Sequence, residues 1–283
     1  MDEVRPDVLF VWRGTHIWPR TLRSIRRRGC RLVGYNNDDP FGPRVYGRAP
    51  WHHRYLWWWY IKTLKEYDTT FVYRPGNVHE AEEAGARNVH VLMPYFIPEV
   101  HHPVELRSDE RERYECDVVF IGHYEPDGRE NYLRALVNAG VHVRLFGGGY
   151  WTREVLGDLS DYFGDTRVLT GADYAKALCG ARMCLAFLSK LNRDVYTRRC
   201  FEIPACGRLL LSQRTAELQR MFVEDREAVF FSSCDELVRK CVSLKEQPDE
   251  LATIARRGRS RLLEDHHDVT SRMQQMMSLI EAS

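Results

Sequence analysis

The chain has 283 residues, of which 44% are hydrophobic and 29% charged, and its formal net charge is +1. These values are those of an ordinary soluble globular protein, and the length is sufficient for two domains with sizeable cores. No apolar run approaches the roughly 20 residues that span a bilayer. Residues 1–10 have neither the basic segment nor the apolar core of a signal peptide. We therefore expect a cytoplasmic protein.

Short apolar runs alternate with longer amphipathic stretches in the first half of the chain, which is the pattern of a parallel β-sheet covered by helices. The predicted strands are Asp7–Trp12, Arg31–Tyr35, Thr69–Tyr73 and Val89–Met93. The predicted helices lie near Pro19–Arg28, Trp51–Glu66 and Asn77–Gly85. Pro94–Tyr114 is rich in proline, histidine and charge and lacks periodicity, so it is the predicted linker.

A second alternating series follows the linker. Its predicted strands are Asp117–Ile121, His142–Phe146, Met183–Phe187, Arg208–Leu211 and Ala228–Phe231. Its predicted helices include Arg129–Ala139, Tyr174–Gly180, Tyr196–Ala205, Cys234–Leu244, Pro248–Leu263 and Thr270–Glu281. Two such series predict an α/β protein with two doubly wound, Rossmann-like parallel-sheet domains, whose ligands bind at the carboxyl ends of the strands.

The first half of the chain is unevenly charged and unusually aromatic. Residues 1–60 contain 11 arginines against five acidic residues, and Trp51–Tyr60 has aromatic side chains all around the predicted helix. A solvated basic helix face and aromatic packing in the core or between domains are the simplest interpretations. The alternative is contact with a membrane surface or a lipid-linked acceptor, which the arginines near this helix would favour. No motif of nucleic-acid recognition accompanies them.

The eight cysteines are scattered along the chain, without a Cys-x-x-Cys pair or a neighbouring histidine pair. Zinc sites and disulfide frameworks need tighter grouping. The pattern therefore favours buried, reduced thiols.

The segment Asn192–Gly207 carries the strongest functional signal. It follows a predicted buried strand and should open a helix, with Asp194 as its N-terminal acid and Gly207 as its end. Arg198 and Arg199 lie near the start of this helix, where the helix dipole disfavours cations, so an anion is expected beside them. Glu202 is spaced for an ion pair with Arg198, which is the alternative explanation of these charges.

The same segment resembles the donor-binding motif of the CgeB-like (spore-maturation type) branch of group 1 glycosyltransferases. The residues that match the motif are Arg199, Phe201, Glu202, Ile203, Pro204, Ala205, Cys206 and Gly207. The resemblance extends to Cys116–Arg129 and Ala228–Met276. It implies the GT-B fold, in which two domains face each other across a cleft. Because related chains usually begin with further strand–helix units, the resemblance leads us to expect a reduced N-terminal domain.

The resemblance also implies roles for individual residues. Glu202 would accept hydrogen bonds from the nucleotide ribose, and Arg199 would face the diphosphate. Asp194 takes the place of a glutamate near the donor sugar and is one methylene shorter. Tyr196 belongs to the same expected substrate-binding set. The last helix would cross back to the first domain, with Met273, Met276 and Ile280 packed on residues 1–100.

Two glycine-containing loops are expected to complete the donor site, because glycine lets backbone N–H groups approach a phosphate or a sugar. Gly122 and His123 follow one predicted strand, and Gly148 lies in the glycine run after the next. Neither loop has the dinucleotide or P-loop fingerprint.

Candidate catalytic residues lie in the first half. Asp38 and Asp39 follow the strand Arg31–Tyr35 and are interpreted either as a general base or acceptor ligand, or as part of an Asx turn before proline. His16 follows the first strand and is a second candidate base. The acid pair could also suggest a metal, but the GT-B type implied by the resemblance needs none.

Taken together with this resemblance, the sequence predicts a hexosyltransferase with an N-terminal acceptor-side domain (1–104), a nucleotide-sugar-binding domain (105–268) and a C-terminal helix (269–283). It would use a nucleoside diphosphate sugar, with UDP and GDP both open, and neither metal nor other cofactor. The acceptor is unidentified (a glycan, a lipid-linked sugar or a small molecule), and homo-oligomerisation is left open. The alternative is a non-catalytic sugar- or nucleotide-binding protein with a degenerate glycosyltransferase fold.

Overall fold

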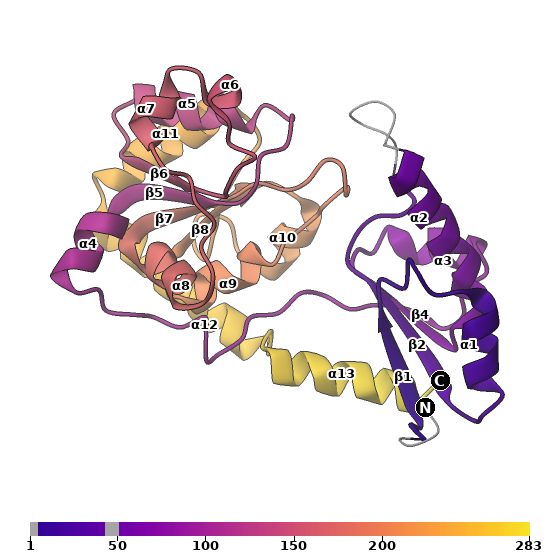
Figure 1. Ribbon diagram of the computed structural model, residues 1–283. Helices are drawn as coiled ribbons and strands as arrows, with labels where there is room; N and C mark the ends of the chain where they lie inside the picture. Colours follow the sequence, from indigo (N-terminus) through magenta and orange to yellow (C-terminus); the bar gives the residue numbers. More distant parts are fainter. Residues whose placement is uncertain (1–4, 43–50) are drawn as a thin grey trace. The chain divides into compact units, whose positions relative to one another are not determined.

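The computed structural model describes residues 5–42 and 51–283, and it forms two α/β units, each built on one parallel sheet (Figure 1). The N-terminal unit combines Met1–Pro94 with the loop Lys190–Asp194 and with Thr270–Ser283. The C-terminal unit consists of Tyr95–Ser189 and Val195–Val269. The chain therefore leaves the N-terminal unit and returns to it twice.

The sheet of the N-terminal unit has the order β1-β2-β3-β4, and all its strands are parallel. They are β1 (Val8–Trp12), β2 (Arg31–Asn36), β3 (Thr69–Val72) and β4 (Val89–Val91). The helices between them are α1 (Pro19–Arg26), α2 (Trp51–Thr63), the short 3₁₀ helix η1 (Leu64–Glu66) and α3 (Asn77–Glu83). Each strand is the next neighbour of the one before it, so this sheet has no point at which the strand order reverses.

Both faces of the N-terminal sheet are covered, because successive side chains of a strand point to opposite faces. Leu32 of β2 packs with Leu22 of α1 on one face. Its neighbour Val33 packs on the other face with Ile280 of α13 (Val269–Glu281), which is 2% exposed. Met276 packs beside Ile280, so the last helix of the chain lies on the sheet of the N-terminal unit.

The sheet of the C-terminal unit has the order β6-β5-β7-β8-β9 and is also entirely parallel. Its strands are β5 (Cys116–Ile121), β6 (Val143–Phe146), β7 (Ala181–Ala186), β8 (Leu209–Gln213) and β9 (Val229–Phe231). Every residue of β5 is buried, as expected for a central strand with both faces covered. The order reverses between β5 and β7, and this switch point is where doubly wound sheets bind ligands.

The helices of this unit include four short ones that the sequence did not predict. The predicted ones are α5 (Arg129–Asn138), α8 (Gly171–Gly180), α9 (Arg199–Ala205), α11 (Cys234–Lys245) and α12 (Pro248–Glu264), and the additional ones are α4 (Ser108–Tyr114), α6 (Arg153–Leu156), α7 (Leu159–Phe163) and α10 (Ala216–Met221). Helix α4 lies inside the predicted linker, and the Glu110 carboxylate accepts the Arg107 N–H at its start, 3.0 Å away. In the described ranges, no helix is long and apolar enough to cross a membrane.

Candidate functional site

Two of the residues expected at the donor site, Gly122 and Arg199, meet at the carboxyl end of β5 in the C-terminal unit. The Arg199 guanidinium donates to the carbonyl of Ile121 and lies over the ring of Phe120, 6.0 Å from its centroid. A Cβ atom at Gly122 would lie 2.7 Å from Phe120 Cζ and 3.0 Å from Arg199 Nη2, so a side chain here would displace the phenylalanine ring or the guanidinium. The structure thus brings Gly122 and Arg199 together at the switch point of the sheet.

Arg199 has no carboxylate partner within the described residues, although its side chain is half-buried. Its neighbour Arg198 is mostly exposed and forms an ion pair with Glu202 at 3.2 Å. An uncompensated, partly buried guanidinium favours an anion beside it. Of the two arginines, Arg199 is therefore the better candidate for a phosphate contact.

Glu202 is only 6% exposed and already has several partners. The Tyr174 hydroxyl donates to its Oε2 at 2.6 Å, and His101 Nε2 lies 3.7 Å from its Oε1. The ion pair with Arg198, which the sequence left open, is formed. A carboxylate accepts about four hydrogen bonds, so these contacts leave capacity for a further donor such as a ribose hydroxyl.

Burial and hydrogen bonding define the protonation states around Glu202. Burial lowers the pKa of His101, and the Glu202 carboxylate only partly opposes this effect. The backbone N–H of Ile97 donates to His101 Nδ1 at 2.9 Å, so the neutral ring carries its proton on Nε2, facing Glu202. Burial also raises the pKa of Tyr174 well above its usual value, which keeps its hydroxyl a donor.

The two glycine loops contact each other. A Cβ atom at Gly147 would lie 1.9 Å from the Gly122 carbonyl oxygen, which also accepts the Trp151 indole N–H at 2.7 Å. Gly148 adopts a φ of +82° and donates its N–H to the Thr166 carbonyl. The close approach of the two backbones explains Gly147, and the positive φ explains Gly148. His123, by contrast, is exposed beside them and lies 3.4 Å from Glu125.

Asp194 does not open helix α9, contrary to the sequence prediction. The helix begins at Arg199 and has seven residues. Asp194 belongs to the loop grouped with the N-terminal unit, where its carboxylate accepts the Arg74 Nε–H at 2.8 Å and a second bond from Nη2. Both side chains of this pair are almost fully buried. The carboxylate is thus used to hold the loop Lys190–Asp194 on this unit.

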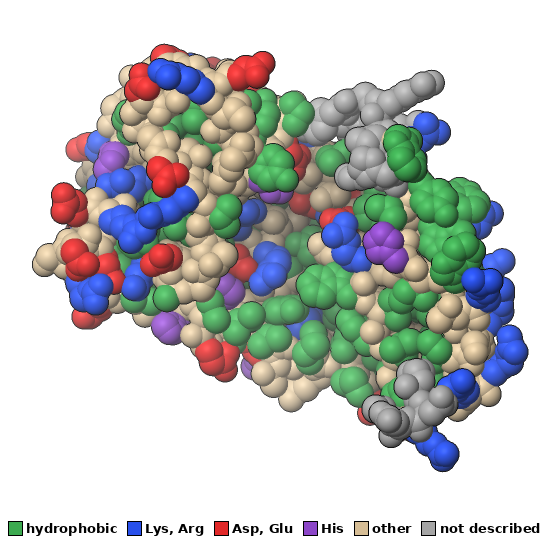
Figure 2. Space-filling view, viewed as in Figure 1, with side chains coloured by type: hydrophobic (Ala, Val, Ile, Leu, Met, Phe, Trp, Pro, Cys, Tyr) green, Lys and Arg blue, Asp and Glu red, His purple; other side chains and the backbone are tan. Residues whose placement is uncertain are grey.

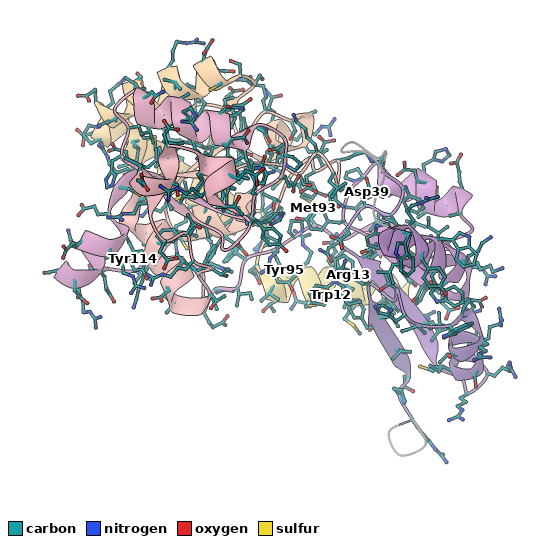
Figure 3. The ribbon with its side chains drawn as sticks, turned by 45° about the horizontal axis from the view of Figure 1, so that its top comes forward. Trp12, Arg13, Asp39, Met93, Tyr95 and Tyr114 are labelled. Carbon is teal, nitrogen blue, oxygen red and sulfur yellow. The ribbon has the colours of Figure 1, made fainter. Side chains whose placement is uncertain are left out.

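Asp38 and Asp39 have different surroundings at the carboxyl end of β2. The side chain of Asp39 is fully buried, at 0% exposure, and is paired with Arg193. It also accepts the Phe41 backbone N–H at 3.0 Å, so the predicted Asx turn is present at this residue. Asp38 is 21% exposed and is paired with Arg13. Figure 3 labels Asp39 together with Trp12, the last residue of β1, and Arg13, which directly follows this strand.

Two other candidates are placed apart from these groups. His16 is exposed in the turn after β1, and no hydrogen bond joins it to another described residue. Tyr196 is 1% exposed and packs edge-on against Phe201, which is the environment of a core residue.

Sequence reasoning missed four residues: Arg74, Tyr174, Arg193 and Glu80. Arg74 lies just after β3, and a charged residue at the carboxyl end of a parallel strand is the signal that would have identified it. Arg193 forms ion pairs with both Glu80, 2.7 Å from its Nη2, and Asp39, and its φ is +49°. The sequence indicates neither the ion pairs nor this φ. Among the residues that the structure describes, no group of three or more His, Cys, Asp or Glu side chains could hold a metal ion.

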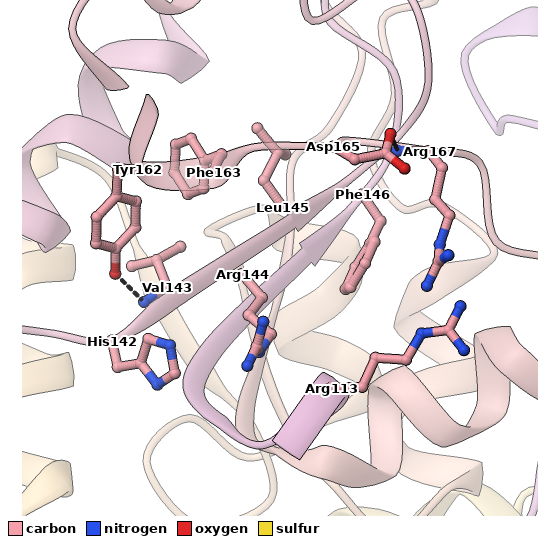
Figure 4. Close-up of a pocket in the computed structure, with 10 residues that line it drawn as sticks. All are labelled: Arg113, His142, Val143, Arg144, Leu145, Phe146, Tyr162, Phe163, Asp165 and Arg167. Carbon is pink, nitrogen blue, oxygen red and sulfur yellow. Dashed lines mark hydrogen bonds between the residues drawn. The ribbon is translucent and has the colours of Figure 1, made fainter. Parts of the chain in front are cut away.

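A cavity of about 280 Å³ lies elsewhere in the C-terminal unit, beside the edge strand β6 (Figure 4). Its lining residues are Arg113, His142, Val143, Arg144, Leu145, Phe146, Tyr162, Phe163, Asp165 and Arg167. Arg199 and Glu202 are not among them. The cavity borders the glycine loops, however, because the Phe146 carbonyl accepts the Gly122 N–H at 2.8 Å.

Comparison with known proteins identifies the family. A model of the family described as glycosyl transferase-like matches residues 129–278, which is more than half of the chain. The chain belongs to this family of glycosyltransferases. No curated protein matches the sequence.

Solved structures support the same fold for this glycosyltransferase. Sucrose-phosphate synthase from Thermosynechococcus elongatus has a TM-score of 0.71 and 14% identity, over 98% of this chain and 73% of that chain. HepE from Anabaena, in complex with UDP-glucose, has a TM-score of 0.69 and 13% identity, over 98% of this chain and 79% of that chain. At such identities the likeness establishes the fold, which is GT-B with two Rossmann-like domains.

Proposed function

We propose that this glycosyltransferase moves a hexose from a nucleoside diphosphate sugar to an acceptor, with Arg199 at the diphosphate and Glu202 at the ribose. The observation that supports this proposal most directly is the half-buried Arg199 guanidinium, which lies beside Gly122 and has no carboxylate partner among the residues that the structure describes. The likeness to HepE in complex with UDP-glucose agrees with such a donor. We also assign the chain to the CgeB-like branch, on the motif from Arg199 to Gly207.

The departing nucleoside diphosphate develops negative charge as the bond between the sugar's anomeric carbon and the diphosphate oxygen breaks. A guanidinium already fixed at that position stabilises this charge without reorganisation, and no metal is required. Glu202 is held by Tyr174 and Arg198, so its carboxylate is preorganised to accept a ribose hydroxyl. Gly122, His123 and Gly148 would complete the donor contacts in the C-terminal unit.

The acceptor side is assigned to the N-terminal unit. Asp38 is a better candidate base than Asp39, because it is partly exposed whereas Asp39 is completely buried in an ion pair. His16 is a second candidate. Asp194 is kept as a proposed contact of the donor sugar, although its carboxylate already accepts hydrogen bonds from Arg74. We place the protein in the cytoplasm, with a glycan, a lipid-linked sugar or a small molecule as its acceptor.

Thermal shift with a panel of nucleosides, nucleoside diphosphates and their sugars tests the donor site. A ligand at 100-fold its dissociation constant adds about 2.7 kcal/mol of stability. Arg199→Met should weaken diphosphate binding by about 1.5–3 kcal/mol, the range for a hydrogen bond to a charged group, and leave nucleoside binding unchanged. Arg239→Met on the exposed face of α11 is the matched control.

Equal diphosphate affinity in the folded Arg199→Met variant would refute the assignment of Arg199. Donor hydrolysis in the absence of acceptor would support the transferase. Tight binding with neither hydrolysis nor transfer would favour the alternative, a non-catalytic sugar- or nucleotide-binding protein.

A further inference from the structure

Helices α1 and α2 of the N-terminal unit carry exposed aromatic rings where a solvated helix usually carries charged or polar side chains. Trp18, Tyr55 and Trp58 are 50%, 52% and 51% exposed. Tyr55 and Trp58 share the outward face of α2, because they are three positions apart. Large aromatic side chains exposed together on one surface indicate an interaction site.

The rings and the cations beside them form one continuous surface. Trp18 packs edge-on against Trp59, with ring centroids 4.6 Å apart. The centroids of Trp59 and Trp58 are 5.7 Å apart, and Trp58 stacks on Tyr55 with centroids 6.2 Å apart. At its two ends, Arg20 lies 4.9 Å from the ring of Trp18, and Lys62 lies 5.9 Å from the ring of Trp58. Arg27 is exposed and lies seven positions after Arg20, which puts it on the same side of α1. We call Trp18, Arg20, Arg27, Tyr55, Trp58 and Lys62 the α1–α2 surface.

The charge of this surface has one sign. Neither α1 nor α2 contains an acidic residue. Arg23 and Arg26 are paired with Glu66 and Asp68 at 2.7 and 2.9 Å. Arg20, Arg27 and Lys62 form no ion pair within the described residues, and all are exposed. Figure 2 shows hydrophobic side chains beside Lys and Arg side chains over these two helices.

We propose that the α1–α2 surface binds the headgroup region of a membrane that contains anionic lipids. Tryptophan and tyrosine favour this region because their rings are apolar and their N–H or O–H groups remain hydrated. Unpaired arginine and lysine side chains are attracted to the anionic headgroups. The helices would lie on the membrane and not cross it.

A second copy of the chain fits the surface less well. Two copies that met through the α1–α2 surface would bring Arg20, Arg27 and Lys62 of each against the same cations, which is unfavourable. Single-stranded nucleic acid would use rings open for stacking. Here the rings pack on one another as a wall, with contacts from Trp18 through Trp59 and Trp58 to Tyr55. Binding to a lipid surface does not require rings that are separately accessible for stacking.

Co-sedimentation of the full chain with vesicles tests this proposal, which is independent of the proposed function because neither donor nor acceptor is present. We expect tight binding to phosphatidylcholine vesicles that contain phosphatidylglycerol and weak binding to phosphatidylcholine alone. Each basic residue contributes about fivefold to binding at an anionic surface, so Arg20→Gln with Arg27→Gln should reduce it by about 30-fold. High salt should have a similar effect on the wild type.

Trp18→Ser with Trp58→Ser should weaken binding to both kinds of vesicle. The matched control changes an exposed arginine and an exposed leucine of the C-terminal unit, Arg239→Gln with Leu263→Ser, and should bind like the wild type. Thermal melts establish that each variant is folded. Equal binding to neutral and anionic vesicles would overturn the proposal. The proposal would also be overturned if the Trp18→Ser, Trp58→Ser variant bound vesicles like the wild type but had lost self-association or binding to an oligonucleotide.

Discussion

Replacing Arg193 with methionine removes the only cation paired with Asp39 in the described part of the chain. Arg193 Nη2 lies 2.9 Å from Asp39 Oδ1 and 2.7 Å from Glu80 Oε2, and its Nε also donates to Asp39. The Asp39 side chain is fully buried, so the variant leaves a buried carboxylate with hydrogen bonds from Asn77 and the Phe41 backbone alone. A charge in that position is poorly tolerated.

The magnitude follows from this burial. Removing one partner of a buried ion pair costs about 3–5 kcal/mol. Arg193 is 36% exposed, so solvent screens part of its interaction, and we expect a smaller loss than this, about 2–3 kcal/mol. Adding Asp39→Asn to Arg193→Met should recover part of the loss, because the amide leaves no buried charge.

Native-state hydrogen exchange measures this effect locally, which matters because two units need not unfold together. Protection of peptides that contain β2 and β3 should fall by about 30- to 150-fold in Arg193→Met. Arg153→Met is the matched control: Arg153 and Asp161 form a pair at 3.3 Å that is almost fully exposed, and its loss should cost less than about 1 kcal/mol. If Arg193→Met behaves like this control, the ion pair does not hold the loop.

Two further predictions concern pH and the last helix. Burial lowers the pKa of His101 below 6.5, so the unfolded chain binds the proton more readily and stability should fall as pH drops below about 6.5. His101→Asn should remove this decline, measured by denaturation at each pH. Arg214 lowers the pKa of Glu224 and of Glu236 to about 2, so the stability that these carboxylates contribute is lost only when the pH falls below about 4.5. Ile280→Ala should destabilise the N-terminal unit by about 2–5 kcal/mol in hydrogen exchange, whereas exposed Met277→Ala should change it by less than about 0.5 kcal/mol; equal effects would mean that α13 is not anchored through Ile280.

Most of the fold could be predicted because parallel strands covered on both faces read as short apolar runs. Each of the nine strands in the described ranges falls at or near a predicted one, including the fully buried β5. The strand order could not be predicted, because the pairing of β5 with both β6 and β7 depends on contacts distant in sequence. Helices α6 and α7 were missed because they are too short to show a period.

The candidate site shows the same division between local and distant information. The proximity of Gly122 and Arg199 follows from the rule that ligand-binding residues gather at the carboxyl ends of parallel strands. The pairing of Asp194 with Arg74 joins residues 120 positions apart, and a single sequence contains no trace of it. The start of α9 at Arg199 was missed for a related reason: the preceding loop is held by the N-terminal unit and does not continue the helix.

The pairing of charges distinguishes Arg199 from the acids that the sequence singled out. Each carboxylate that the sequence singled out has a cation beside it, as the pairs Asp38–Arg13, Asp39–Arg193, Asp194–Arg74 and Glu202–Arg198 show. Arg199 alone among the motif's charged residues keeps its charge uncompensated within the described chain. The candidate site therefore has an excess of positive charge, even though the chain as a whole is nearly neutral. Such an excess favours a ligand that brings its own negative charge, as a nucleoside diphosphate does.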